Sequence, residues 1–276
     1  MPLRVTSINL NGIRAAAKRG FEDWLAAEAP TALLMQEVRA DEDITRTILG
    51  DEWDAALVPC RIKGRAGVGI AVHRDRGQII GEPRSILDDA ESDVDSGRWV
   101  EAQVLADGAD SPVRLVSAYF HSGEKDTPKQ EAKMAHLPRI SERLARLLDE
   151  ARGADGPQTV VCGDFNIVRS RADIKNWTPN HNKRAGVLDE EIAFLDAWAT
   201  AGWRDVVREL AGDVQGPYSW WSWRGKAFDN DAGWRIDYHW ATPGLADRAR
   251  SFAIGRAASY DDRFSDHAPV RVDYDA

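Results

Sequence analysis

Short apolar runs recur along the whole chain, several of them bounded by glycine, proline or aspartate, and they predict β-strands. They are rich in valine, isoleucine, leucine, tryptophan and tyrosine, most of which favour strands. Nine such runs cover residues 3–9, 31–36, 53–59, 67–73, 98–105, 113–119, 158–163, 236–241 and 268–273. Hairpin-like pairs alternate with helical crossovers, which predicts mixed sheets rather than an all-parallel sheet.

Other segments have apolar residues at the 3.6-residue spacing of a helix. Phe21, Trp24 and Leu25 share one helical face. A longer helix carries, despite Pro138, the apolar face Met134, Leu137, Ile140, Leu144, Leu147 and Leu148. Asp189 can cap a third helix, which carries Ile192, Leu195 and Ala199. Together with the mixed sheets, these helices predict a layered α/β sandwich with the helices outside.

Three long loops, near residues 84–97, 120–130 and 166–188, interrupt this pattern. Loops of this length in a compact domain tend to be functional or disordered. No stretch has the composition of a linker, so we expect a single domain over residues 1–276.

Composition narrows the class of protein. A chain of 276 residues suits one large α/β domain, and its hydrophobic content of 43% excludes a disordered chain. No apolar run approaches the roughly 18 residues of a membrane-spanning helix, and the N-terminus has no signal-peptide pattern. Cys60 and Cys162 form no CxxC motif, so we interpret them as packed thiols of a cytoplasmic protein.

The net charge of −9 argues against a broad basic face for nucleic acid. The acids of one stretch, Asp88, Asp89, Glu91, Asp93 and Asp95, are typical of a solvated loop. The bases gather elsewhere, in the groups Arg14, Lys18 and Arg19; Lys125, Lys129 and Lys133; Lys175, Lys183 and Arg184; Arg224 and Lys226. Net acidity is therefore compatible with a basic rim around one cleft.

Four polar motifs lie at the ends of predicted strands. They are Asn9-Leu10-Asn11-Gly12, Gln36-Glu37, Gly163-Asp164-Phe165-Asn166 and Ser265-Asp266-His267. The first three follow an apolar run and the last precedes one. Strand ends are where an α/β fold displays its site residues. Four of them that offer carboxylate, amide and imidazole groups predict one cleft for a hard cation and a phosphate.

These groups suit hydrolysis of a phosphodiester, which needs an activated water, a cation and help for the leaving oxygen. Glu37 offers an oxygen ligand suited to Mg²⁺. Asp164 and Asn166 can place a base and an amide side by side, although an Asx-turn equally explains the pair. Asn9 could hold either the metal shell or the Asp164 carboxylate.

His267 can reach the phosphate, but it needs a partner that fixes its tautomer and favours its charged form. Asp237 is the best candidate for that partner. Each residue alone has a structural explanation, such as a turn, a helix cap or a buried ion pair. Their joint occurrence, in this order and at these strand ends, favours the functional interpretation.

The same residues carry a family resemblance. The segments Ser7 to Ala15, Leu34 to Glu37, Gly163 to Ile167, Gly233 to Tyr238 and Ser265 to Val270 look like the signature set of exonuclease III. That is the abasic-site endonuclease group within the endonuclease/exonuclease/phosphatase superfamily. The resemblance covers essentially the whole chain and implies a four-layer sandwich of two packed mixed sheets flanked by helices, with the site at one edge.

The resemblance also implies roles. Glu37 would bind Mg²⁺ or Mn²⁺ with Asn9 and Asp266 nearby. Asp164 and Asn166 would orient or deprotonate the attacking water, and His267, oriented by Asp237, would contact the phosphate. The wider set around the metal is Asn9, Glu37, Asp164, Asn166, Asp266 and His267. Tyr119, otherwise a core aromatic, matches a tyrosine that approaches the phosphate or leaving group.

Substrate recognition is implied by a second set of residues. Trp220, Trp234 and Ile236 would line a small apolar pocket for a baseless deoxyribose, unless they form a plain aromatic core. Arg14 and Lys18 would hold backbone phosphates, unless they belong to a solvated helix start. Arg224 stands where a wedge residue enters the duplex.

The implied function is a monomeric, Mg²⁺-dependent DNA repair enzyme that cuts double-stranded DNA 5′ of abasic sites, acts as a 3′–5′ exonuclease and trims blocked 3′ ends. Two residues depart from the pattern of the family: His121 stands in place of a proline and Ser122 in place of an amide. Both changes affect the balance between these activities. The alternatives are a superfamily phosphatase acting on a phosphoinositide or sphingolipid, and a catalytically silent DNA-binding protein.

Overall fold

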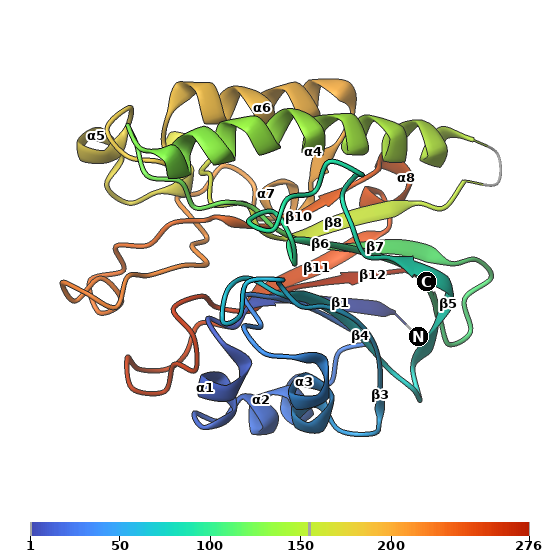
Figure 1. Ribbon diagram of the computed structural model, residues 1–276. Helices are drawn as coiled ribbons and strands as arrows, with labels where there is room; N and C mark the ends of the chain where they lie inside the picture. Colours follow the sequence, from blue (N-terminus) through green and yellow to red (C-terminus); the bar gives the residue numbers. More distant parts are fainter. Residues whose placement is uncertain (1, 154–155, 276) are drawn as a thin grey trace.

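The computed structural model describes residues 2–153 and 156–275, which form two six-stranded sheets packed face to face (Figure 1). The first sheet has the order β11-β12-β1-β2-β4-β3 and the second the order β5-β6-β7-β8-β10-β9. In the first sheet the strands are β1 (Leu3–Asn9), β2 (Ala32–Gln36), β3 (Trp53–Val58), β4 (Val68–His73), β11 (Ala249–Ile254) and β12 (Val270–Tyr274). In the second they are β5 (Gly77–Arg84), β6 (Trp99–Ala106), β7 (Val113–Tyr119), β8 (Thr159–Asp164), β9 (Arg204–Asp205) and β10 (Asp237–Ala241).

Helices cover the outer face of each sheet (Figure 1). The first sheet is covered by α1 (Ile13–Ala17), α2 (Phe21–Glu28) and α3 (Glu42–Leu49), and the second by α4 (Pro128–Arg152) and α6 (Asp189–Ala201). The shorter elements are η1 (Arg171–Asp173), α5 (Trp177–Asn180), α7 (Val206–Ala211) and α8 (Pro243–Ala246). The pairs β1–β2 and β7–β8 are parallel and the other paired strands antiparallel, so the predicted four-layer sandwich with mixed sheets is confirmed.

The main core lies between the two sheets. Val5 and Ile70 of the first sheet belong to the same buried cluster as Leu115 and Val160 of the second. Two further cores join the helices to the sheets, and the apolar face of α4 lies in the one beside α6. Burial of this apolar surface supplies most of the driving force for the layered arrangement. No helix of the described residues is long and apolar enough to cross a membrane.

All nine predicted strands are present, but β5, β9 and β11 were not predicted. β5 is an edge strand that contains Gly81 and Pro83 and is largely exposed, so it lacks the apolar alternation of a buried strand. β11 is likewise an edge strand, and none of its residues is fully buried. β9 has only two residues, too few for any pattern.

The three predicted helices also exist, and α4 runs through Pro138. The capping role expected of Asp189 is wrong, because Asp189 is already the first residue of α6 and its carboxylate accepts a hydrogen bond from Asn182 Nδ2 instead. The buried Glu191 accepts from the backbone N–H of Leu188 and so satisfies the start of the helix. The loops predicted at 120–130 and 166–188 are partly helical, because α4 begins at Pro128 and the second loop contains η1 and α5.

The acidic stretch after β5 is not wholly a solvated loop, as the sequence predicted. Asp95 is buried, and Arg139 of α4 donates to both Asp95 and Asp88, at 2.9 and 2.6 Å. His121 also contacts Asp95, at 2.8 Å. The loop is therefore fixed to α4 and to the end of β7. The two cysteines are free thiols, Cys162 fully buried and Cys60 partly buried, as predicted.

Candidate active site

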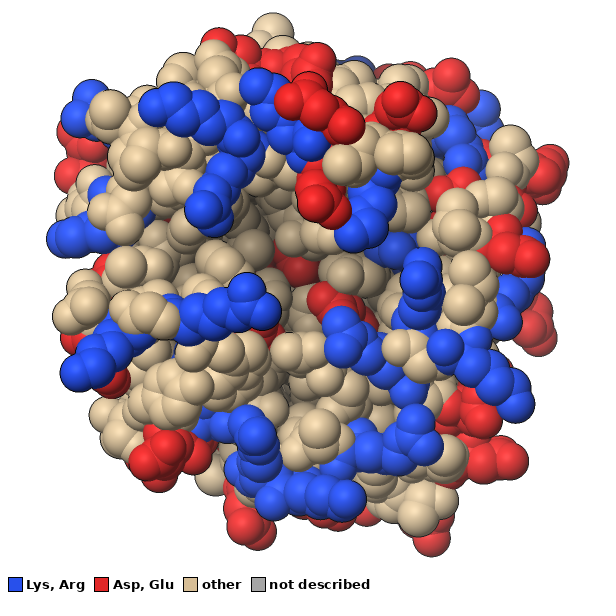
Figure 2. Space-filling model, turned by 60° about the vertical axis from the view of Figure 1, so that its left-hand side comes forward, with Lys and Arg blue, Asp and Glu red and all other residues tan. Residues whose placement is uncertain are grey.

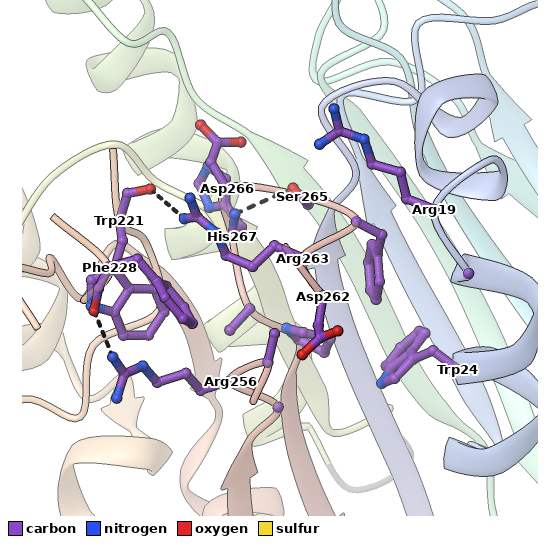
Figure 3. Close-up of a pocket in the computed structure, with 16 residues that line it drawn as sticks. Arg19, Trp24, Trp221, Phe228, Arg256, Asp262, Arg263, Ser265, Asp266 and His267 are labelled. Carbon is purple, nitrogen blue, oxygen red and sulfur yellow. Dashed lines mark hydrogen bonds between the residues drawn. The ribbon is translucent and has the colours of Figure 1, made fainter. Parts of the chain in front are cut away.

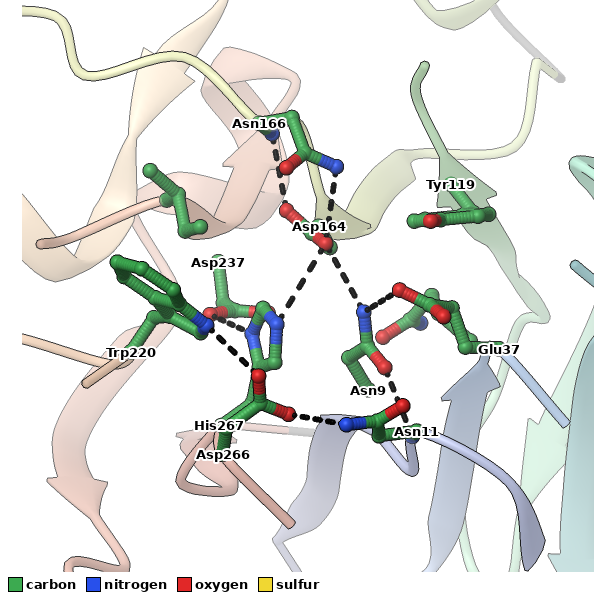
Figure 4. A network of polar contacts seen from close by, with 12 residues as sticks. Asn9, Asn11, Glu37, Tyr119, Asp164, Asn166, Trp220, Asp237, Asp266 and His267 are labelled. Carbon is green, nitrogen blue, oxygen red and sulfur yellow. Dashed lines mark hydrogen bonds and ion pairs between the residues drawn. The ribbon is translucent and has the colours of Figure 1, made fainter. Parts of the chain in front are cut away.

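The polar motifs meet at one edge of the sandwich because of strand register. Asn9 is the register partner of Gln36 in the parallel pair β1–β2, which brings Asn9 beside Glu37. Asp164 is opposite Tyr119 in the parallel pair β7–β8 and opposite Asp237 in β10. Carboxyl ends of parallel strands lie at the same edge of a sheet. Figure 4 shows the resulting cluster, with residues of both sheets facing one another.

Asn9 joins the two sheets at this edge. Its Nδ2 donates to Asp164 Oδ2 at 2.9 Å and to Glu37 Oε1 at 3.0 Å (Figure 4). The two roles that the sequence left open for Asn9, support of Asp164 and support of the metal ligand, are therefore structurally compatible. Asn9 is fully buried, so its position is set by the core of the first sheet.

Asp164 accepts further hydrogen bonds from Asn166. The backbone N–H of Asn166 donates to Asp164 Oδ1 at 2.9 Å, which is the predicted Asx-turn, and Asn166 Nδ2 donates to Oδ2 at 3.0 Å. Asn166 Nδ2 also reaches the carbonyl of Phe120 at 3.1 Å. The turn and the functional interpretation therefore coexist, since the turn aims the amide at the carboxylate.

His267 lies between two carboxylates. Its Nδ1 is 2.9 Å from Asp237 Oδ2, and its Nε2 is 3.7 Å from Asp164 Oδ2. Ser219 donates to Asp237 Oδ2 at 2.6 Å and so holds the second carboxylate in place. The pairing of His267 with Asp237 expected from the sequence is present in the structure.

The electrostatics of this cluster favour a charged imidazole and a weakly acidic Asp164. Burial alone would lower the pKa of His267, but the carboxylates of Asp237 and Asp164 outweigh it and raise that pKa to about 10. Burial raises the pKa of Asp164 to about 7; the charge of His267 opposes the rise, and the carboxylates of Asp237 and Glu37 add to it. A carboxylate with a pKa near neutrality is suited to accept a proton in catalysis.

Three residues at the strand ends have left-handed backbones. Asn11, Glu37 and Asn166 have φ angles of 47°, 47° and 53°. A residue other than glycine with a left-handed backbone destabilises the fold by on the order of 1 kcal/mol or more. Such strain is concentrated at functional sites. Here it turns these side chains from the strand direction into the cleft.

Asp266 is half-buried and is held by two donors. Asn11 Nδ2 donates to Asp266 Oδ1 at 2.8 Å, and Trp220 Nε1 donates to Oδ2 at 3.0 Å. Ser265 donates to the carbonyl of Asn9 at 2.6 Å, which attaches the loop before β12 to the end of β1. These contacts place Asp266 on the side of the cleft formed by the first sheet.

Trp220, Trp234 and Ile236 form an apolar wall beside His267. The rings of Trp220 and Trp234 meet edge to face with centroids 5.6 Å apart, and both are half-buried. Ile236 is buried in the same cluster as Val168 and Val187. The Trp220 ring centre is also 6.5 Å from that of His267. The three predicted pocket residues are thus together and next to the charged cluster.

Tyr119 lies under Arg98 at the end of β7. The Arg98 guanidinium is 4.7 Å from the centre of the tyrosine ring. Burial, followed by the charges of Glu37 and Asp164, raises the pKa of Tyr119 well above its ordinary value, so it stays a neutral phenol. The neighbouring His121 is neutral as well, because burial lowers its pKa to about 4.

Cations surround the cleft. Figure 2 shows lysine and arginine side chains around a hollow whose floor contains acidic groups. Arg14, Lys18 and Arg224, the predicted DNA-binding cations, are all exposed. Arg14 belongs to α1 and Arg224 to the loop before β10, so they approach the site from different parts of the chain.

Several supporting residues were not predicted. Arg39 forms an ion pair with Glu37, and its place two residues after Glu37 is a weak signal. Lys133, which the sequence grouped with the cations of the rim, is instead fully buried; it donates to the carbonyl of Asn166 at 2.9 Å and pairs with Glu191 at 2.7 Å. The sequence signal for this burial was that Lys133 falls on the apolar face of α4.

The donor set fits a hard divalent cation. Glu37, which pairs with Arg39, and Asp266 offer carboxylate oxygens, and Asn9 offers an amide oxygen, the ligand types that such a cation prefers. Among the described residues, ligand atoms of Asp164, Asp237 and His267 also lie within 4.8 Å of one another. The charged imidazole of His267 accounts for that second group, since its two ring nitrogens each face a carboxylate oxygen. Roles of individual residues as metal ligands stay predictions.

A four-layer sandwich with such a carboxylate, amide and imidazole edge is that of a phosphoester hydrolase. Residues 6–267 match the endonuclease/exonuclease/phosphatase family, to which the chain belongs. It is 27% identical over 278 residues to an exodeoxyribonuclease of Bacillus subtilis (strain 168), and the match covers 98% of each protein. The resemblance to the exonuclease III group that the motifs predicted is confirmed.

Solved structures have the same fold. An AP endonuclease from Archaeoglobus fulgidus is similar with a TM-score of 0.78 and 22% identity over 99% of this chain and 100% of that one. The 3′ phosphatase NExo from Neisseria, bound to a product DNA hairpin, gives a TM-score of 0.79 and 23% identity, also over 99% and 100%. At these identities the likeness concerns the fold alone.

Proposed function

We propose that the protein is a DNA repair phosphodiesterase that uses Mg²⁺ or Mn²⁺. It would cleave double-stranded DNA 5′ of abasic sites and remove blocking groups from 3′ ends, as a cytoplasmic monomer. The observation that carries this proposal is the buried contact set of Asp164, which accepts from Asn9 and Asn166 while facing His267. The names of the relatives, an exodeoxyribonuclease and an AP endonuclease, support the same reaction.

The side chains divide the chemistry among them. Asp164, aimed by Asn9 and Asn166, would accept the proton of the attacking water as its oxygen bonds to phosphorus. His267, kept charged by Asp237, would donate to a phosphoryl oxygen. A divalent cation held by Glu37 would neutralise charge on the phosphate. The bond from phosphorus to the 3′ oxygen breaks and that oxygen takes a proton from solvent, which leaves a 3′ hydroxyl on the preceding nucleotide and a 5′ phosphate on the baseless sugar.

Recognition of the substrate would rest on the apolar wall and the cationic rim. Trp220, Trp234 and Ile236 offer apolar surface to a deoxyribose beside His267. Arg14 and Lys18 would hold phosphates of the backbone. Arg224, at an exposed loop, would enter the duplex as a wedge.

The two alternative functions are less well supported. A catalytically silent DNA-binding protein would have no reason to retain a strained Glu37 or a buried Asp164–His267–Asp237 arrangement. A lipid phosphatase would need surface for a headgroup and a membrane, whereas an exposed cationic rim and paired tryptophans suit a nucleic acid.

A cleavage assay tests the proposal. A labelled duplex with one tetrahydrofuran abasic analogue is compared with an intact duplex of the same sequence, each with Mg²⁺ or with EDTA. We expect Mg²⁺-dependent cleavage of the abasic duplex alone in short incubations. Equal cleavage of both duplexes, or release of phosphate from a phosphoinositide but no cleavage of DNA, would refute it.

A further inference from the structure

The two sides of the catalytic cluster are supported by different contacts. On one side, the loop of Asp266 and His267 is fixed close to these residues: the backbone N–H of His267 donates to Ser265 Oγ at 3.2 Å, a bond drawn in Figure 3. The backbone N–H of Trp221 donates to the carbonyl of Asp266 at 3.1 Å. Figure 4 shows Asn166 on the opposite side of the cluster. Its turn is held by a side chain from the helical layer over the second sheet.

That side chain is Lys133 of α4. Its Nζ donates to the backbone carbonyl of Asn166 at 2.9 Å and is the single donor to that carbonyl among the described residues. Asn166 has a left-handed backbone, with a φ of 53°, and its N–H and side-chain amide both donate to Asp164. A left-handed residue keeps its conformation only where the surrounding contacts impose it. The hydrogen bond from Lys133 is such a contact, because it fixes the peptide that follows the two donors to Asp164.

Glu191 of α6 fixes the lysine and the end of the long loop after Asn166 at once. Its Oε1 is 2.7 Å from Lys133 Nζ. Its Oε2 accepts from the backbone N–H groups of Gly186 at 2.5 Å and Leu188 at 3.2 Å. Gly186 lies directly against the turn, since a Cβ atom added there would be 2.7 Å from the Asn166 carbonyl oxygen. The buried ion pair therefore joins both ends of this loop to the helical layer.

Stability alone does not explain a charge pair at this place. Lys133 is 1% exposed and Glu191 is fully buried, between two helices whose other buried contacts are mainly apolar. The free energy of removing two charges from water offsets their attraction, so an apolar pair of similar volume is often as stable or more stable. What the lysine adds, and an apolar side chain lacks, is a hydrogen-bond donor for the Asn166 carbonyl.

From these contacts we propose that Lys133 is a positioning residue of the active site. By holding the Asn166 carbonyl, it fixes the turn whose two N–H donors are aimed at Asp164. Lys133 acts on the reaction only through Asn166, so it controls the rate of the cut and leaves the affinity for DNA unchanged. The inference rests on the proposed function, since it assumes that Asp164 takes part in cleavage of a phosphodiester.

Two variants that differ only at position 133 test this inference. Glu191→Gln keeps an acceptor for the loop, and Lys133 keeps N–H donors for Asn166 whether or not it is protonated. Lys133→Met/Glu191→Gln removes the donor without leaving an unpaired buried charge. Single-turnover cleavage of the tetrahydrofuran duplex is measured with Mg²⁺. We expect Glu191→Gln to cleave within about threefold of the wild-type rate and the double variant to be about 10- to 100-fold slower, the effect of a reacting group misplaced by about 1 Å.

Two further measurements separate positioning from a general structural role. Dissociation constants for the abasic duplex, from fluorescence anisotropy in EDTA, should agree within about twofold between the two variants. The same pair of variants is also made with Asn166→Ala. Because Lys133 acts through Asn166, its replacement should cause little further loss of rate in that background, whereas two independent defects would multiply. A loss as large as in the presence of Asn166 would overturn the inference.

The inference is also overturned if the double variant cleaves within about threefold of the Glu191→Gln rate, or if its loss of rate is matched by an equal loss of affinity. Should its thermal melt show that it does not fold, Lys133→Leu/Glu191→Gln takes its place. A wild type that does not cleave the abasic duplex refutes the proposed function instead. A crystal structure of the double variant then still tests Lys133: an Asn166 amide turned away from Asp164 supports the inference, and an unchanged turn overturns it.

Discussion

At the scale of single residues, Asp164 has the environment of a base that works near neutral pH. It is buried, accepts hydrogen bonds from two asparagines and lies near a charged His267. The hydrogen bonds and the imidazole favour the carboxylate, whereas burial and the neighbouring acids favour the protonated form. Because burial dominates, the pKa of Asp164 is raised from its ordinary value to about 7.

This balance predicts the pH dependence of the reaction. The base must be deprotonated, so the single-turnover rate should rise with pH through about 7. His267 must be charged, so the rate should fall as pH rises through about 10. Rates on the abasic duplex at saturating Mg²⁺, from pH 5.5 to the highest pH at which Mg²⁺ stays soluble, provide the measurement. A flat profile between pH 5.5 and 8 would contradict the assignment of Asp164 as the base.

Glu37 gives a second prediction at this scale. Glu37→Ala should abolish turnover at ordinary Mg²⁺ concentrations, because stabilisation by the metal is worth several kcal/mol. Raised Mg²⁺ should rescue part of the activity. Glu22→Ala, a change at an exposed acid of α2, is the matched control and should leave the rate unchanged. A Glu37→Ala rate within tenfold of the wild type would exclude Glu37 as the principal ligand.

At the scale of secondary-structure elements, the sequence predicted those features that a local pattern of apolar and polar residues encodes. Buried strands such as β1, β2 and β8 are apolar runs that end in a polar motif, so both their existence and the site at their ends could be inferred. Edge strands such as β5 and β11 are exposed and have no such pattern. The pairing of Lys133 with Glu191 joins α4 to α6 and was not predictable, because only the tertiary fold brings those two helices together.

The apolar wall carries a prediction about specificity. Packing one face of a sugar against Trp234 is worth about 1–3 kcal/mol, so Trp234→Ala should weaken abasic cleavage by roughly 10- to 100-fold. Removal of a 3′ phosphate, which presents no baseless sugar to the wall, should be reduced much less. Both rates are measured on one preparation, with the thermal melt as a control. Parallel loss of both activities with an unchanged melt would assign Trp234 a general supporting role.

At the scale of the whole molecule, an acidic protein presents a basic rim around one cleft. The net charge of −9 limits binding to a few focused phosphate contacts, whereas a broad positive field would make many. The parallel strand pairs of both sheets end at the edge that this rim surrounds, so fold and charge define the same face (Figure 2).

The salt dependence of binding follows from this distribution. Neutralising a number Z of phosphates gives a log–log slope of about −0.9Z, so we expect a shallow slope, on the order of −2 to −5. Arg14→Ala should reduce its magnitude by about 1. Dissociation constants for the abasic duplex in EDTA over a range of KCl concentrations provide the test. A steep slope that Arg14→Ala does not change would place the DNA on another surface.

The most direct test of the account asks whether the Asp164 and His267 cluster performs the cut. Single-turnover cleavage of the tetrahydrofuran duplex is followed for the wild type, Asp164→Asn and His267→Ala, and the ends of the products are identified. We expect the wild type to leave a 3′ hydroxyl and a 5′ phosphate at the abasic residue, and each variant to lose at least about 100-fold in rate while binding the duplex normally. Variants that cleave within tenfold of the wild-type rate, or a wild type that cuts on the 3′ side of the abasic residue, would contradict the account.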